Sequence, residues 1–220
     1  MNRYYNLLPL FTFLLTICIY IAALQVYWFR LDWGDGSKTY LYFKHFRNIN
    51  STTSSDNSYE YLDDTESVLR VCTAMMALSF VLVLVAFALH TVLLLGYKKS
   101  SSTVPQTSRL ITGGALIAIV VTISYFTRLM NSIHADCNSD SRPLINFPCA
   151  QLPDGENGFI RKSGTVTWGP YIGWNLSVAA SVALLFGLIA VCYITLVKAR
   201  KRRSYKNIDD EHLVIWNTPL

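Results

Sequence analysis

Pro170-Tyr171-Ile172-Gly173-Trp174 opens a stretch without charged side chains that runs to Val197, and Lys198-Ala199-Arg200-Lys201-Arg202-Arg203 follows at once. An α-helix rises about 1.5 Å per residue, so this stretch is long enough to cross a hydrocarbon core of about 30 Å. A block of Lys and Arg directly after such a helix is typical of the cytoplasmic end of a membrane span. The stretch therefore predicts a transmembrane helix at 170–197 whose C-terminal end faces the cytoplasm.

Three other apolar runs share this character, and the composition as a whole agrees with them. Hydrophobic residues make up 52% of the chain and charged residues only 15%, which is too few charges for an ordinary soluble domain. The first run could be a cleaved signal peptide, but its length favours a retained helix. We expect an all-α membrane protein that forms one domain over 1–220, a four-helix bundle with spans at about 7–28, 68–96, 110–130 and 170–197.

The four spans divide the rest of the chain into an inner loop at 97–109, external loops at 29–67 and 131–169, and a tail at 198–220. Ten of the 19 Lys and Arg residues, but only three of the 14 Asp and Glu residues, lie in the N-terminal stub, the inner loop and the tail. This bias predicts that both termini are cytoplasmic. The basic tail should contact anionic lipid, and we do not expect nucleic acid as a partner.

The first external loop begins with two aromatic-rich segments on either side of Gly34-Asp35-Gly36-Ser37. Such turn residues between aromatic runs predict a β-hairpin that rises from the membrane. The following segment, 48–58, is polar and rich in Ser and Thr, which favours a mobile loop. It contains Asn50-Ser51-Thr52, an N-glycosylation acceptor. A second acceptor pattern, Asn175-Leu176-Ser177, lies within the last span and should not be used.

Cys137 and Cys149 are the two cysteines of the second external loop. The compartment outside a membrane of the secretory route is oxidising, so we predict a disulfide between them. Further along the same loop, 159–161 and 165–168 flank Lys162-Ser163-Gly164 and could form a second hairpin. An outer sheet assembled from both loops is plausible, although the pattern alone does not demonstrate it.

Small residues recur in the third and fourth spans, where they allow close approach of helix backbones in lipid. Packing within one bundle is favoured over a dimer seam, and a homo-oligomer is the alternative. In the second span, His90 is expected to be a neutral imidazole bonded to a neighbouring helix. The small residues expected to pack are Gly113, Gly114, Gly173, Ser177, Ser181, Ala183 and Gly187.

The tail after the basic block, 204–220, is expected to be disordered and to carry short binding motifs. Tyr205 and Ile208 have the tyrosine-x-x-hydrophobe spacing that a sorting adaptor binds in extended form. Thr218 and Leu220 give the chain an end that suits strand addition to a PDZ groove. These motifs do not decide the compartment. The plasma membrane is favoured, and endosomal membranes are the alternative.

Gly169-Pro170-Tyr171-Ile172-Gly173-Trp174 at the start of the last span resembles the fourth helix of the claudin-like tetraspan superfamily. Thr112-Gly113-Gly114 and Ser124-Tyr125-Phe126 resemble its third helix. The resemblance implies a left-handed four-helix bundle with an extracellular sheet and a role in cell contact or membrane organisation. The first external loop departs from the claudin signature because it has Trp33-Gly34 but no cysteine. We therefore do not expect this chain to share the pore-forming or strand-forming role of claudins.

The leading functional hypothesis is a non-catalytic membrane glycoprotein that contacts membrane or extracellular proteins through its external loops. Aromatic residues are enriched in interface cores, although these could instead form the aromatic belt at the membrane surface. The alternatives are a small transporter or channel subunit and a trafficking adaptor of the endosomal system. No catalytic motif is present, and no cofactor or metal is expected. The residues expected to bind a partner are Trp33, Tyr40, Tyr42, Phe43 and Phe46.

Overall fold

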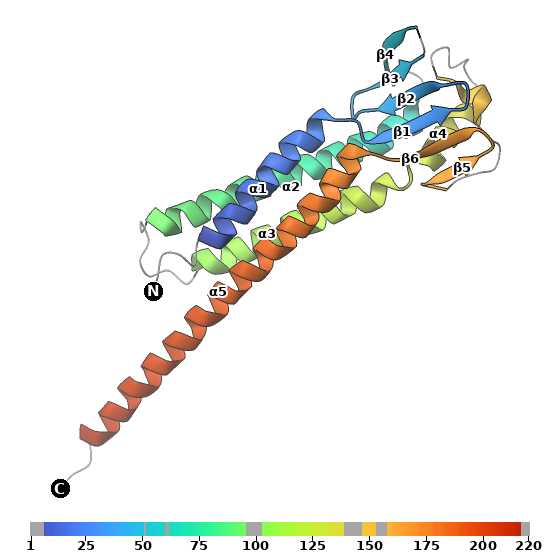
Figure 1. The fold of residues 1–220 in the computed structure, drawn as a ribbon. Helices are drawn as coiled ribbons and strands as arrows, with labels where there is room; N and C mark the ends of the chain where they lie inside the picture. The colour runs from blue at the N-terminus through green and yellow to red at the C-terminus, as the bar shows by residue number, and fades with distance from the viewer. Residues whose placement is uncertain are drawn as a thin grey trace.

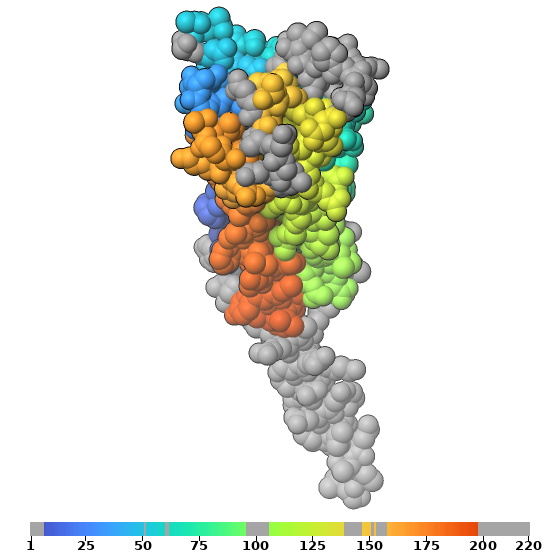
Figure 2. Space-filling view, turned by 90° about the vertical axis from the view of Figure 1, so that its right-hand side faces the viewer, coloured from blue at the N-terminus to red at the C-terminus, as the bar shows by residue number. Residues whose placement is uncertain are grey.

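The computed structural model describes residues 7–50, 52–59, 62–95, 103–138, 147–152 and 158–216, which form a helical bundle with a sheet at one end (Figure 1). The helices are α1 (Leu7–Gln25), α2 (Asp63–Leu95), α3 (Thr103–Phe126), α4 (Leu129–Asn138) and α5 (Ile172–Trp216), with a 3-10 turn at Cys149–Gln151. Figure 2 shows α3 in green beside α5 in orange, below the strands.

Four segments are long and apolar enough to cross a membrane: Leu7–Gln25, Asp63–Leu95, Gln106–Asn138 and Ile172–Val197. Their outward surfaces are apolar too, since Phe11, Ile117 and Phe186 are each more than 60% exposed. A helix that is hydrophobic on all sides needs an apolar surrounding, which lipid provides. The prediction of four spans is therefore confirmed as far as length and composition allow.

Hydrogen bonds between polar side chains connect the helices inside the bundle. The Tyr20 hydroxyl of α1 lies 2.6 Å from Ser79 Oγ of α2, which donates to the Ala115 carbonyl of α3 at 2.7 Å. Nearer the other end, His90 Nε2 lies 2.8 Å from Ser108 Oγ of α3, which confirms the predicted bond to a neighbouring helix. α2 packs mainly on α3, and α1 mainly on α5.

The small residues of the third and fourth spans differ in how closely they approach a neighbour. Gly187 lies against Thr12 and Phe13 of α1, and Gly114 faces the Leu82 side chain of α2. A Cβ atom on Gly113 would meet no atom within 4 Å, so no neighbouring element requires a glycine at this position. In α5, Gly173 and Ser177 are buried, whereas Ser181 and Ala183 are half-buried.

Six antiparallel strands pair in the order β4-β3-β2-β1-β6-β5. Their bounds are β1 (Phe29–Trp33), β2 (Ser37–Leu41), β3 (His45–Ile49), β4 (Ser54–Ser58), β5 (Arg161–Ser163) and β6 (Val166–Pro170). Both predicted hairpins form, with Gly36 and Gly164 at positive φ in their turns. Pairing of β1 with β6 joins the two loops, with Leu31 opposite Trp168, so the expected combined sheet exists.

The polar segment 48–58, predicted to be a mobile loop, instead completes the β3–β4 hairpin. Backbone pairing fixes it, and the Asn50 amide donates to the Thr53 carbonyl across the turn at 2.8 Å. Arg47 adds two bonds to Asp56, from Nε at 2.6 Å and Nη2 at 2.9 Å. Polar side chains suit this strand because it is an exposed edge of the sheet, where no apolar face has to be buried.

Several helix boundaries also differ from prediction: α1 ends at Gln25, and α3 starts at Thr103, inside the expected inner loop 97–109. α2 starts at Asp63, before the expected residue 68, because acidic residues in a first turn stabilise the positive end of the helix dipole. The segment expected to open the second loop, 131–138, belongs to α4. α5 continues through the tail predicted to be disordered, because no Gly or Pro interrupts the chain between Gly187 and Asn217.

Substitution of Gly173 by alanine tests the close approach of α5 to the α1–β1 connection. The new Cβ would overlap the indole of Trp28, which is fully buried and donates from Nε1 to the Ala23 carbonyl at 2.8 Å. We expect Gly173→Ala to lower the free energy of unfolding by about 1–3 kcal/mol. Gly113→Ala, where space is open, should cost nothing. Thermal unfolding of both variants in detergent provides the comparison, and equal stability would contradict the packing described.

Candidate functional site

The sheet has an apolar face toward the bundle and a polar face away from it. Along β1, Phe29, Leu31 and Trp33 are buried, whereas Arg30 and Asp32 between them are half-exposed. This alternation follows from the two-residue period of a strand. The buried face contacts the end of α3 and the second loop, since Phe29 lies 6.2 Å from Phe126 and Trp33 lies 6.2 Å from Phe147 between ring centroids.

Two of the aromatic residues predicted to bind a partner are instead part of this core. Trp33 is 1% exposed and Phe46 is 2% exposed. Phe147, from the second loop, packs against both rings and covers them. Trp33 and Phe46 therefore lie in the core and not on the outward face where a partner was expected to bind them. Phe43 is half-buried and packs on Trp28 at 4.4 Å.

Tyr40 and Tyr42 are half-exposed and belong to a group that we call the tyrosine cluster, together with Tyr27 and Tyr171. The Tyr27 ring lies at the centre, 4.5 Å from Tyr40, 5.8 Å from Tyr42 and 4.9 Å from Tyr171 between ring centroids. Burial, followed by the effect of the Tyr171 phenol, raises the pKa of Tyr27. The cluster presents phenol hydroxyls and ring edges.

The cluster combines residues that are far apart in the sequence. Tyr27 follows α1 and Tyr171 precedes α5, and two backbone hydrogen bonds hold these junctions together. The Tyr171 amide donates to the Trp28 carbonyl at 2.8 Å, and the Gly173 amide donates to the Tyr27 carbonyl at 3.0 Å. Sequence reasoning missed Tyr27 and Tyr171, because only the pairing of β1 with β6 brings them together.

Two charged pairs lie on the outward face, one in contact with the cluster and one farther from the bundle. Arg30 pairs with Asp32 and also lies over the Tyr171 ring, with its guanidinium carbon 5.6 Å from the centroid. Further out, the hydrogen bonds from Arg47 hold the pKa of Asp56 below its usual value. Asn50 lies beyond them, exposed in the turn between β3 and β4. The outward face therefore changes from tyrosines near the bundle to ion pairs near the free edge of β4.

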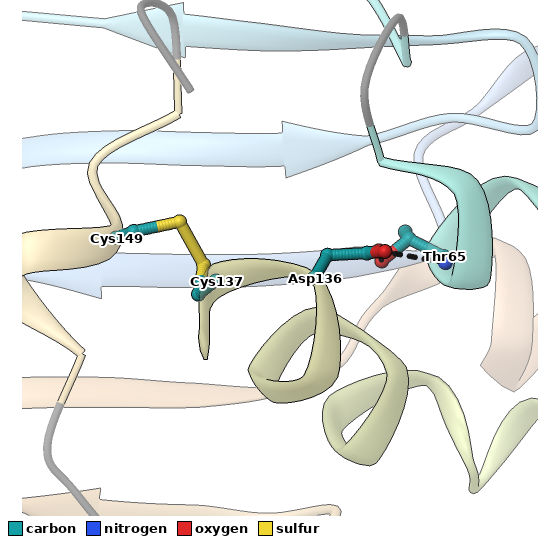
Figure 3. The surroundings of a disulfide bond; sticks show 4 residues. All are labelled: Thr65, Asp136, Cys137 and Cys149. Atoms are coloured by element: carbon teal, nitrogen blue, oxygen red, sulfur yellow. Dashed lines mark hydrogen bonds between the residues drawn. A yellow bond between two sulfur atoms is a disulfide. The ribbon is translucent and has the colours of Figure 1, made fainter. Parts of the chain in front are cut away.

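Helix α4 connects α2 to Cys149, which follows the Phe147 segment that covers the buried face of the sheet (Figure 3). One carboxylate oxygen of Asp136 accepts from the Asp64 amide at 3.0 Å, and the other accepts from the Thr65 amide at 2.8 Å and the Thr65 hydroxyl at 2.6 Å. These amides belong to the first turn of α2, where they have no partner within the helix. The next residue, Cys137, forms the predicted disulfide with Cys149, two residues beyond Phe147.

The remaining sequence-predicted residues lie at the opposite end or outside the described ranges. Tyr205 and Ile208 are in the helical tail of α5, so the extended form that an adaptor binds would require local unwinding. Thr218 and Leu220 lie outside the described residues. Within the described ranges, no group of three or more His, Cys, Asp or Glu residues could hold a metal ion. Comparison with models of protein families and with curated proteins finds no match.

Removal of the Asp136 carboxylate should destabilise the sheet end of the protein. Asp136→Ala leaves the Asp64 and Thr65 amides without their acceptor, and we expect a loss of about 1–3 kcal/mol in the free energy of unfolding. Asp136→Asn retains one acceptor oxygen and should lose less. Asp56→Ala, which removes an exposed ion pair, serves as the control and should change little. Thermal unfolding tests the order, and a larger effect of Asp56→Ala would contradict it.

Proposed function

We propose that this is a non-catalytic multi-pass protein of the plasma membrane, with the sheet outside the cell and both termini in the cytoplasm. The four apolar helices support the membrane location. The orientation is supported by the dense Lys and Arg block that follows the last span, at the end of the bundle opposite the sheet. An endosomal membrane gives the same orientation, with the sheet in the lumen.

The function that we propose is contact with other membrane or extracellular proteins through the outward face of the sheet. One observation carries this proposal: residues from both loops form a fixed surface with the half-exposed tyrosine cluster at its end nearest the bundle. Tyrosine is enriched in protein interfaces because its ring buries a large area while its hydroxyl forms a hydrogen bond. Backbone bonds already order Tyr27 and Tyr171, so less entropy is lost when a partner binds.

We also propose a distant relationship to the claudin-like tetraspan superfamily. The resemblance of 169–174 at the start of α5 and a sheet built from both loops support it. The disulfide lies in the second loop, and the first loop has no cysteine. For this reason the proposal includes contact and membrane organisation, but no charge-selective pore.

A transporter or channel subunit is the less favoured alternative. The polar side chains named within the bundle bond to neighbouring helices, as Tyr20 does with Ser79 and His90 does with Ser108. A trafficking role through Tyr205 would require part of α5 to unwind. Neither alternative accounts for an ordered sheet with tyrosines on its outward face.

Glycosylation mapping tests the side of the membrane on which the sheet lies. Asn50 is exposed in the β3–β4 turn, so the wild-type protein should carry a glycan that peptide N-glycosidase removes. Asn50→Gln should migrate on a gel like the enzyme-treated protein. Asn175→Gln is the matched control and should retain the shift, because its acceptor pattern lies within α5. A glycan that persists in Asn50→Gln would contradict the assignment.

The tyrosine cluster is tested by the double variant Tyr40→Ser/Tyr42→Ser. Neither residue is fully buried, so the protein should still reach the membrane and form its disulfide. Cells would be treated with a membrane-impermeant lysine-reactive crosslinker, which can react at Lys38 on β2. We expect a defined crosslinked species with the wild type and at least a tenfold weaker one with the double variant, since loss of about 1.4 kcal/mol of binding energy is tenfold in affinity.

Tyr125→Ser is the control for this experiment, because Tyr125 is half-buried on α3 outside the cluster. Its crosslinking should equal that of the wild type. Unchanged crosslinking in the double variant would exclude the cluster as the contact surface. An equal loss in the control would show that the effect comes from damage to the fold.

A further inference from the structure

We infer that a groove between the β2–β3 connection and α2 binds one phospholipid with an anionic headgroup. The groove has a volume of about 700 Å³, which lies within the usual range of ligand sites. Phe43 and Lys44 line it from the connection, Tyr59 lines it from the segment before α2, and α2 supplies the opposite wall. The inference relies on α2 crossing the membrane but not on the tyrosine cluster, which is a different surface.

The mouth of the groove carries two cations and one carboxylate. Lys44 is exposed, and the Arg70 side chain is 76% exposed. Glu66 accepts from Arg70 Nη2 at 2.7 Å, one helical turn away, and orients the guanidinium without using all of its donors. The mouth therefore has a net positive charge. Arg and Lys are the side chains that bind phosphate groups, so the mouth is complementary to an anionic lipid headgroup.

Below the mouth, the groove becomes apolar. Its floor is formed by Thr73, Ala74 and Ala77 on α2, and Ala77 lies about 10 Å along the helix from Arg70, at about 1.5 Å per residue. The Thr73 hydroxyl already donates to the Leu69 carbonyl at 2.7 Å, so the floor presents no polar group that requires water. Farther along α2, the larger Leu78 is 48% exposed.

Two aromatic side chains give the groove fixed walls. Phe43 packs on the buried Trp28, with ring centroids 4.4 Å apart. Tyr59 is 4% exposed, and its hydroxyl donates to the Tyr42 carbonyl at 2.5 Å. Because both walls are held by the core, the groove exists before a ligand arrives, which reduces the entropy lost on binding.

A membrane lipid fits these features better than a soluble ligand does. Ala74 and Ala77 of the floor are exposed, as are Val71 and Leu78 next to them on α2, and this helix is long and apolar enough to cross a membrane. Arg70 lies near the start of α2 and Lys44 faces the same mouth from the β2–β3 connection, so both cations fit the depth of the headgroups, and the alanine floor fits the depth of the glycerol and the first methylenes. A headgroup without net negative charge would place its own cation near Lys44 and Arg70, so anionic lipids should be preferred.

Native mass spectrometry of the full-length protein in detergent tests this inference. The protein would be titrated with phosphatidylserine and, separately, with phosphatidylcholine of identical acyl chains. We expect the first bound phosphatidylserine to bind at least tenfold more tightly than the first phosphatidylcholine. Lys44→Gln/Arg70→Gln should abolish this preference. Ala77→Phe, which fills the floor, should weaken binding of phosphatidylserine by a similar factor.

Each variant has a matched control. Arg128→Gln removes an exposed arginine at the sheet end of α3, outside the groove, and should leave the preference unchanged. Ala179→Phe places the same ring on the exposed surface of α5 and should not affect binding. Glycerophosphoserine, the headgroup without acyl chains, should not compete with the lipid.

Three results would overturn the inference. Equal affinities for the two lipids in the wild type would show that the groove does not select charge. An equal loss in Arg128→Gln would show that any cation at the boundary suffices. Competition by glycerophosphoserine would show that the mouth of the groove binds a soluble anion and does not require a lipid. None of these results depends on whether the tyrosine cluster contacts a protein, so the two proposals fail independently.

Discussion

Pairing between β1 and β6 is the interaction on which the rest of the structure depends. An isolated two-stranded hairpin is marginally stable in water, and each loop of this chain supplies hairpins that need further support. Their pairing makes one six-stranded sheet, with Leu31 opposite Trp168 inside it. The strands run directly into helices, and the Tyr171 amide donates to the Trp28 carbonyl at this junction. The sheet therefore holds α1 and α5 together, which agrees with the packing of these helices along the bundle.

The same register decides which side chains are available to a partner. It turns Trp33 and Phe46 toward Phe147, which covers them from the second loop. Phe147 is held in this position because Asp136 binds the start of α2 and Cys137 is linked to Cys149. On the other face, the register leaves four tyrosines half-exposed beside ion pairs. The contact function that we propose therefore rests on the pairing of two loops that are distant in the sequence.

Much of the fold could be predicted because its causes are local. Runs of apolar residues indicate spans, Gly36 and Gly164 indicate tight turns, and two cysteines in one loop indicate a disulfide. The polar strand β4 could not be predicted, since backbone pairing to β3 determines it and Ser54–Ser58 has no apolar alternation. Only part of the tyrosine cluster could be predicted. Tyr40 lies in the aromatic-rich loop, whereas Tyr171 joins the cluster only because the strands of the two loops pair. Burial of Trp33 depends on Phe147, which follows it by more than a hundred residues.

A disulfide trap across the joined loops measures the pairing of β1 with β6 most directly. Asp32 and Thr167 lie opposite each other, and the Cβ atoms of such pairs are about 4.5–5.5 Å apart. Asp32→Cys/Thr167→Cys should form a new disulfide in the purified protein, detected as a linked peptide by mass spectrometry without reduction. Asp32→Cys/Lys162→Cys should not, because Lys162 lies on β5, two strand spacings or about 10 Å away. Equal linkage in the two variants, or none at 32 and 167, would contradict the joined sheet.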